Sequence, residues 1–357
     1  MKSKYPLLDS GLLTLGFVGW LLVSSTVLVV AVIIVAIVLI VPYAMSGGLT
    51  GDVNALMESV NGVVTNPYLL YAFTGVAELL LIVPFLFYLK IKKLPLKALL
   101  GNRATALQCA LAVLVGLLLS PAVTGLDVLF STLLRALGAT IPDTSALEPK
   151  TIGQLAVGML AIGVAAGVVE EPVFRGVALR GLGSVLGKWG AVLLSGVVFS
   201  LIHMEGVGFV VRFLVGVVLG LMAWRCGSVL PGVFAHAAFN SSSLLTSFLL
   251  ARLLPGWEGF TFPGVGAEVS GVLTFLLLSI PFALLSLGAY WLFTRVTPAS
   301  ARWRDRPYVK KADVKGSHWL AWAGVIVVSV GLTLTTMAIM WMPSMMDMLD
   351  QLDKLPK

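Results

Sequence analysis

The stretch Gly167-Val-Val-Glu-Glu-Pro-Val-Phe-Arg-Gly176 places two carboxylates and an arginine at the end of an apolar run that begins near Ile152. A charged side chain near the centre of a bilayer costs about 2.5–3.5 kcal/mol, and less near an interface. Charges in such a run therefore point to a functional site inside the membrane, and they need polar partners from other helices. Two further stretches supply candidates, namely Phe199-Ser-Leu-Ile-His203 and His236-Ala-Ala-Phe-Asn240.

The composition of the whole chain is that of a membrane protein. Hydrophobic residues make up 58% of the 357 residues, charged residues make up 11%, and the mean hydropathy is +1.00. Soluble domains contain only about 45–50% apolar residues. Because several apolar runs exceed the length that crosses a hydrocarbon core, we predict an all-α, polytopic transmembrane helical bundle of about 8–9 spans. Cys109 and Cys226 lie in or beside apolar runs and indicate neither a disulfide framework nor a metal site.

Nine apolar runs follow one another along the chain. They cover approximately residues 12–41, 67–88, 104–126, 152–171, 191–203, 207–224, 230–250, 270–293 and 318–342. The first is about twice as long as the apolar core of a secretory signal, so we expect it to be a retained span. The fifth is the shortest and fits a short, tilted or re-entrant segment. Gly163 with Gly167, and Gly216 with Gly220, form small-residue faces that let a neighbouring helix approach closely.

The basic residues indicate the orientation. Most lysines and arginines lie at the N-terminus and in the loops near residues 90–103, 175–188, 225 and 295–315. The positive-inside rule then places the N-terminus in the cytoplasm and, with nine spans, the C-terminus outside. These loops account for the net charge of +7, so we expect the lipid bilayer and no nucleic acid as a partner.

Residues four positions apart share one face of a helix. Glu171 and Arg175 have this spacing, so we expect an ion pair between them, with Glu170 offset by roughly 100°. His203, His236 and Asn240 are further polar side chains in apolar runs. Unsatisfied polar groups in lipid cost several kcal/mol each, so we expect Glu170 and these three to contact one another.

Structural interpretations compete with this site. The Glu170–Glu171 pair with Arg175 could form a charge cluster in the headgroups, His203 could be interfacial, and His236 with Asn240 could join helices by hydrogen bonds. Two other charges lie in apolar runs, Glu78 and Arg212. They could pair with each other, line a cavity or, for Arg212, reach the interface. We assign them no catalytic role, and we interpret His318 as structural or interfacial.

The three motifs in this order resemble the CPBP family, which comprises the type II CAAX prenyl proteases and bacteriocin-processing or self-immunity proteins. The motifs here are Glu170-Glu171-x-x-x-Arg175, Phe199-x-x-x-His203 and His236-x-x-x-Asn240. The resemblance covers roughly residues 150–250. It divides the chain into N-terminal flanking helices at 1–150, a catalytic core at 151–250, and C-terminal flanking helices with a tail at 251–357.

The resemblance implies an intramembrane endopeptidase. By analogy, Glu170 is the general base that activates water, His203 assists it, and His236 and Asn240 stabilise or orient the oxyanion. Glu171 and Arg175 form a structural ion pair. This chemistry is reasonable because a carboxylate in an apolar, partly dry pocket is a stronger base near neutrality. Donors preset around an oxyanion are worth about 3–4 kcal/mol each.

Zinc chemistry is an alternative mechanism. Glu170, His203 and His236 could serve as metal ligands, with water in the fourth position. Against zinc, the chain has no His-Glu-x-x-His helix, and Asn240 is a poor zinc ligand. We therefore expect catalysis without a cofactor.

Two other functions compete with proteolysis. The protein could be a non-catalytic membrane scaffold or a bacteriocin self-immunity protein that binds a peptide or a partner helix. A transporter ranks last, because no pair of matching broken helices indicates an inverted repeat. For the protease, we expect a peptide or a membrane protein as substrate. We also expect a multi-pass location in a bacterial cytoplasmic membrane, with the active site towards the cytoplasm.

Overall fold

The computed structural model describes residues 6–45, 58, 61–62, 65–93, 95–142, 144–257, 259–299 and 314–353. Within these ranges the chain is helical and forms no strand; one isolated bridge joins Gly101 to Ser228. The α-helices are α1 (Pro6–Met45), α3 (Pro67–Leu80), α4 (Ile82–Lys92), α5 (Leu96–Leu100), α6 (Ala106–Ala136), α7 (Ile152–Gly158), α8 (Ala165–Glu171), α9 (Leu179–Leu201), α10 (Phe209–Cys226), α11 (Leu230–Leu253), α12 (Ala267–Val296) and α14 (Leu320–Asp353). Two π-helical segments, η3 (Met159–Val164) and η4 (Pro172–Ala178), and two 3₁₀ segments, η2 (Ser145–Leu147) and η6 (Gly316–Trp319), complete the described elements.

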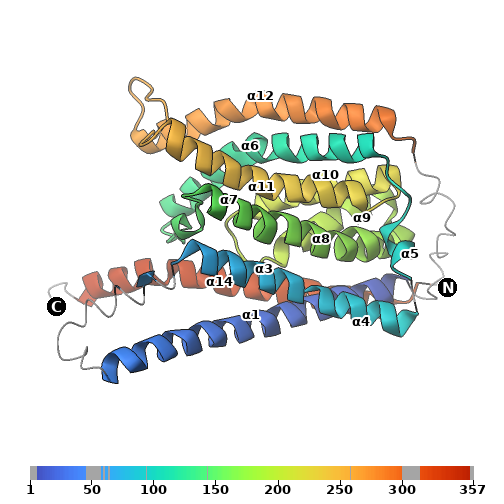
Figure 1. Cartoon of the computed structure of the whole chain (residues 1–357), viewed down its shortest axis with the longest axis horizontal. Coiled ribbons are helices and arrows are strands. Elements are labelled where there is room, and N and C mark those ends of the chain that lie inside the picture. Colours follow the sequence, from blue (N-terminus) through green and yellow to red (C-terminus); the bar gives the residue numbers. More distant parts are fainter. Residues whose placement is uncertain are drawn as a thin grey trace.

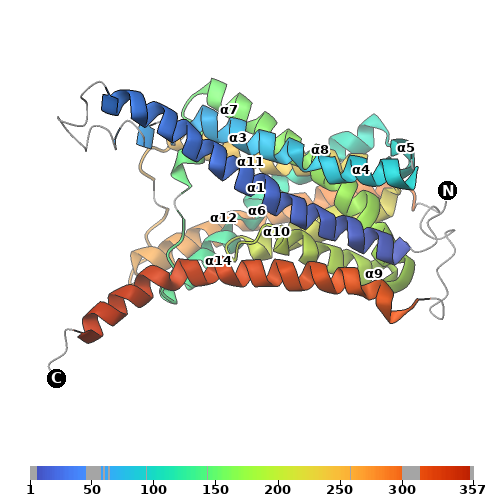
Figure 2. The same cartoon turned by 90° about the horizontal axis from the view of Figure 1, so that it is seen from below.

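The described residues contain eight helices that are long and apolar enough to cross a membrane. This confirms the predicted class, a multi-pass helical bundle. The helices run roughly along one axis, and they stack from α12 and α6 through α11 and α8 to α3 and α1 (Figure 1). Helix α14 packs against α1 and α9 on another side of the bundle (Figure 2).

One of these eight helical stretches runs from Ile152 to Leu201 and contains 50 residues. A straight helix of this length would measure about 75 Å, far more than the roughly 30 Å of a hydrocarbon core. The helix breaks at Gly187, whose φ of +70° is a left-handed value that glycine adopts easily. A Cβ on Gly183 would lie 3.8 Å from Cβ of Ala191, so the chain folds back at this point. The fourth and fifth predicted runs are therefore the two halves of a helical hairpin.

Small residues bring the helices of this hairpin close to their neighbours. A Cβ on Gly163 or Gly167 would lie about 3 Å or less from the backbone or side chains of α11. A Cβ on Gly216 would lie 3.0 Å from Cα of Gly196, and one on Gly220 would lie 3.4 Å from Val192. The two small-residue faces are confirmed as close contacts of η3 and α8 with α11, and of α10 with α9.

Wide π-helical turns flank the two glutamates. Segment η3 precedes α8, and η4 follows it and begins at Pro172. Proline has no N–H group to donate, so the regular α-helical bond to the preceding turn cannot form there. Such turns occur often at functional sites because they change the direction of the side chains around them. The proposed division of the chain at residues 150 and 250 stays a prediction, and helices from all three parts are in contact.

Candidate active site

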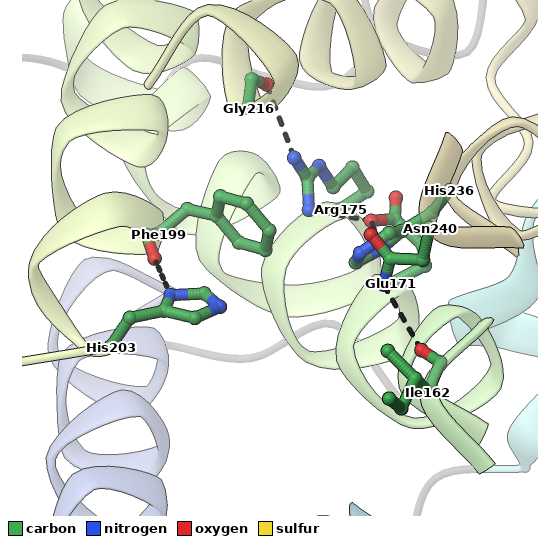
Figure 3. A network of polar contacts seen from close by, with 8 residues as sticks. All are labelled: Ile162, Glu171, Arg175, Phe199, His203, Gly216, His236 and Asn240. Atoms are coloured by element: carbon green, nitrogen blue, oxygen red, sulfur yellow. Dashed lines mark hydrogen bonds and ion pairs between the residues drawn. The ribbon is translucent and has the colours of Figure 1, made fainter. Parts of the chain in front are cut away.

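Glu171 is the centre of a buried polar network. Arg175 Nη1 donates to Glu171 Oε1 at 2.6 Å, and both side chains are completely buried. His236 Nδ1 lies 3.1 Å from the same oxygen. Glu171 on α8 therefore links η4 to α11. The ion pair between Glu171 and Arg175 that the four-residue spacing predicted is present (Figure 3).

Arg175 has further partners on the second half of the hairpin and on α10. Its Nη2 donates to the carbonyl of Gly216 at 3.1 Å. Its guanidinium carbon lies 4.6 Å from the centre of the Phe199 ring, a cation–π geometry. These contacts fix the guanidinium between three helices and so hold the carboxylate of Glu171 in one position.

Phe199 lies between the two histidines. Its ring centre is 5.3 Å from that of His203 and 5.7 Å from that of His236, both in edge-to-face geometry. The centre of the Phe199 ring also lies 5.2 Å from that of Phe174, so the Phe199 ring is fixed by packing. Phe199 thus contacts both motif histidines, His236 on α11 and His203 just after the end of α9.

His203 follows the end of α9 and is partly exposed. Its Nδ1 lies 2.9 Å from the carbonyl of Phe199, which can only accept, so Nδ1 carries the proton. In a neutral ring, Nε2 is then an acceptor. The next residue, Met204, has a left-handed φ of +55°, and its carbonyl accepts a hydrogen bond from Thr336 on α14.

Asn240 lies one turn beyond His236 on α11. Its Nδ2 donates to the carbonyl of Ile162 at 3.0 Å, within the π-helical segment η3 (Figure 3). This bond uses one of the two amide hydrogens and leaves the second available to another acceptor. The side chain is partly exposed, so its remaining donor is accessible.

Glu170 differs from Glu171 in having no counter-charge in contact. It is only 4% exposed, and its Oε2 has no hydrogen-bond partner within the described residues. The charged groups that act on it electrostatically are Glu78, Glu171, Arg175 and Arg212. Glu170 therefore has a buried carboxylate oxygen without a protein partner. Oε2 of Glu171 also lacks a partner, but Oε1 of Glu171 is bound by Arg175 and His236.

The structure does not form the direct contacts that we expected among Glu170, His203, His236 and Asn240. His236 contacts Glu171 instead, because a Cβ on Gly232 would lie 2.6 Å from Glu171 Oε2 and the missing side chain leaves room for that carboxylate. Arg212 pairs with Glu205 at 2.5 Å, and not with Glu78. Within the described ranges, no group of three or more His, Cys, Asp or Glu side chains is arranged to hold a metal ion, so the alternative zinc ligands do not form a preset site.

Residues 152–242 match the family model described as type II CAAX prenyl endopeptidase, Rce1-like. This confirms the resemblance over about a quarter of the chain, a segment that contains the hairpin, α10 and the three motifs. No curated protein and no solved structure gives a significant match. The chain is thus a multi-pass membrane protein with a segment similar to the CAAX prenyl endopeptidases.

Proposed function

We propose that the protein is an intramembrane endopeptidase in which Glu170 activates the attacking water. The observation that carries this proposal is the difference between the two adjacent glutamates. Oε1 of Glu171 is held by Arg175 and His236, although Oε2 of Glu171 has no partner. The side chain of Glu170, by contrast, is buried and forms no ion pair in the described part of the chain, and its Oε2 has no hydrogen-bond partner. A general base needs a free carboxylate oxygen within reach of water, and an apolar setting strengthens it as a base.

The proposed reaction uses the other motif residues in distinct roles. Glu170 takes a proton from water while the water oxygen bonds to the carbonyl carbon of the scissile peptide. His203 accepts or directs the second water hydrogen through Nε2. The oxyanion is stabilised by Asn240 and by His236, which donates through Nδ1 to Glu171 and, with both ring nitrogens protonated, through Nε2 to the oxyanion. The proton on Glu170 then passes to the leaving amine as the C–N bond breaks.

We place the site towards the cytoplasmic side of a bacterial cytoplasmic membrane. Lys92 at the end of α4, Lys188 at the turn of the hairpin and Arg225 at the end of α10 belong to the loops rich in basic residues. Figure 1 shows the ends of α4 and α12 and the short helix α5 at one end of the bundle. The positive-inside rule favours the cytoplasm for that end. We propose a peptide or a membrane-protein segment as the substrate.

The test compares peptide termini in membranes of cells that carry the wild-type protein or Glu170→Gln, by mass spectrometry. Gln preserves size and hydrogen bonding but cannot act as a base. Glu268→Gln, at an exposed site on α12, is the matched control. We expect new termini with the wild type and with Glu268→Gln only. Identical termini in all three, at equal expression, would overturn the proposal and favour a binding or immunity protein.

A further inference from the structure

Arg212 is a charge within an apolar helix that the proposed reaction does not use. It is the fourth residue of α10, and Arg225 at the basic end of the same helix follows it by 13 positions. This separation corresponds to about 20 Å along the helix, which is less than the roughly 30 Å of a hydrocarbon core. An ionisable side chain at such a depth is costly and usually belongs to a functional site, so the contacts of Arg212 are informative.

Helices α9 and α10 run antiparallel beside the candidate site. Near the basic end of the pair, a Cβ on Gly220 would lie 3.4 Å from Val192. Near the other end, the hydroxyl of Ser200 donates to the carbonyl of Phe209 at 2.6 Å. The contacts therefore advance along α9 as they go back along α10, and the loop that joins the two helices carries His203.

Arg212 and His203 lie at the same level of this helix pair. A Cβ on Gly216 would lie 3.2 Å from Cδ1 of Phe199, so these two residues face each other. Arg212 precedes Gly216 by four positions and His203 follows Phe199 by four, which places each about one turn nearer the joining loop. Arg212 also acts electrostatically on His203, in agreement with this placement. The guanidinium therefore lies on the side of the site to which His203 belongs.

The contacts of Arg212 leave much of its guanidinium open. Nη2 pairs with Oε2 of Glu205 at 2.5 Å, and Nη1 donates to the carbonyl of Val207 at 2.9 Å. A guanidinium has five N–H donors, so three of them have no acceptor within the described residues. The Arg212 side chain is 26% exposed. Such a planar fork can bind a carboxylate through two parallel hydrogen bonds.

Glu205 holds the guanidinium weakly. The Glu205 side chain is 60% exposed, and an ion pair with so exposed a partner contributes little to stability. Glu205 can therefore turn away and leave its place to another carboxylate at little cost. Gly208 provides room beside the guanidinium, because a Cβ there would lie 3.3 Å from Cζ of Arg212, and its φ of +73° suits glycine.

We propose that Arg212 binds a carboxylate of the substrate in place of Glu205 and thereby positions the peptide beside His203. The carboxylate belongs either to the C-terminus of the substrate or to an acidic side chain near the scissile bond. Arg212 is then a substrate-binding residue that selects acidic peptides, and Glu205 competes with the substrate for it. The selection of substrates rests on the proposed function, whereas the binding of a carboxylate at Arg212 does not require hydrolysis.

Binding of synthetic peptides to the purified protein tests the inference without hydrolysis. The probes are three N-acetylated apolar peptides of equal length: one with a free C-terminal carboxylate, one with a C-terminal amide, and one amide with a single internal glutamate. Their affinities are measured in Glu170→Gln, so that the peptides stay intact. We expect at least one of the two carboxylate peptides to bind about 10-fold more tightly than the uncharged peptide, because hydrogen bonds between charged groups are strong. The peptide that gains affinity identifies the kind of carboxylate that is bound, and equal affinity of all three would overturn the inference.

Substitutions of the ion pair, made in the same background, separate binding from a structural role. Arg212→Gln should abolish the preference for a carboxylate, and Arg212→Lys should keep part of it, since an ammonium group retains the charge but not the fork. Glu205→Gln should strengthen the binding of the preferred peptide by about two- to fivefold, because the competing carboxylate is gone. Arg295→Gln, at an exposed site on α12, is the matched control and should leave the preference unchanged.

A purely structural ion pair would give a different pattern. Loss of either partner would then weaken binding alike, so equal effects of Arg212→Gln and Glu205→Gln would overturn the inference, as would a preference that persists in Arg212→Gln. Glu205→Gln changes an exposed side chain, so it decides the matter even if Arg212→Gln does not fold. If the preference depends on Arg212 while Glu170→Gln leaves the peptide termini in cells unchanged, the proposed function fails and the carboxylate site stands.

Discussion

His236 Nδ1 lies 3.1 Å from Glu171 Oε1, the oxygen that also accepts the hydrogen bond of Arg175 at 2.6 Å. One carboxylate oxygen thus joins a buried arginine on η4 to a histidine on α11. The ion pair expected from the i,i+4 spacing therefore has a second contact, and this contact orients a side chain that we propose to act in catalysis. Glu171 links the stability of the hairpin to the geometry of the site.

Removal of the Glu171 carboxylate should destabilise the protein strongly. Glu171→Ala leaves Arg175, which is 1% exposed, without its counter-charge. Breaking a buried pair in this way costs about 3–5 kcal/mol. We expect a clear drop in the thermal unfolding midpoint in detergent. In the control Glu205→Ala, which breaks a pair whose glutamate side chain is 60% exposed, the change should be at most about 1 kcal/mol.

The double variant Glu171→Leu with Arg175→Leu separates the two functions of Glu171. Replacement of a whole buried pair by apolar residues is often neutral or stabilising. We expect the double variant to recover much of the stability lost in Glu171→Ala, but not activity, because His236 loses its orienting partner. Full activity in the double variant would contradict the role of Glu171 at the site.

The missing side chain of Gly232 makes room for Glu171. A Cβ at this position would lie 2.6 Å from Glu171 Oε2, so Gly232→Ala should displace the carboxylate from His236. We expect a loss of about 1–3 kcal/mol in unfolding free energy, the usual cost of overpacking, together with reduced hydrolysis. The control is Gly271→Ala on α12, where nothing lies within 4 Å and the change should be neutral or stabilising. Equal stability and activity in the two variants would contradict this account.

The sequence predicts the parts of this structure that depend on composition and on spacing within one helix. Apolar runs predict the spans, Gly163 and Gly167 predict a close helix contact, and the four-residue spacing predicts the Glu171–Arg175 pair. The reversal between the fourth and fifth runs is predicted by the basic loop near residues 175–188, but its place at Gly187 is not, because a glycine beside a lysine has no distinctive pattern. Contacts between helices are also missed: the His236–Glu171 contact depends on the space at Gly232 and on the direction set by the π-helical turns.

The flanking helix α14 supports the loop that carries His203. Met204 holds a left-handed φ of +55°, which is unfavourable for a residue other than glycine, and Thr336 donates to its carbonyl. The isosteric change Thr336→Val removes this donor, so the loop should relax and His203 should move. We expect activity to fall about two- to tenfold, since a hydrogen bond contributes about 0.5–1.5 kcal/mol.

Thr335→Val is the matched control for this prediction. Its hydroxyl is exposed and donates to the carbonyl of Gly331 within its own helix, at 2.9 Å. We expect wild-type activity from this variant. Equal losses of activity in the two variants would mean that any valine substitution in this part of α14 lowers activity, and that the contact with Met204 has no specific role.

Metal dependence separates the two mechanisms that the motif residues allow. Nδ1 of His203 is hydrogen-bonded to the carbonyl of Phe199, and Nδ1 of His236 is hydrogen-bonded to Glu171. Only Nε2 of each ring therefore remains to bind a metal ion. No group of three or more potential ligands is arranged for a metal ion in the described ranges, and a structural or catalytic zinc needs at least three protein ligands. We therefore expect hydrolysis to be insensitive to zinc chelators, and zinc in the purified protein to be far below one ion per chain, in the wild type and in His203→Ala alike. Stoichiometric zinc that is lost in His203→Ala, with activity removed by a chelator and restored by zinc, would instead establish Glu170, His203 and His236 as ligands of a metal-bound water.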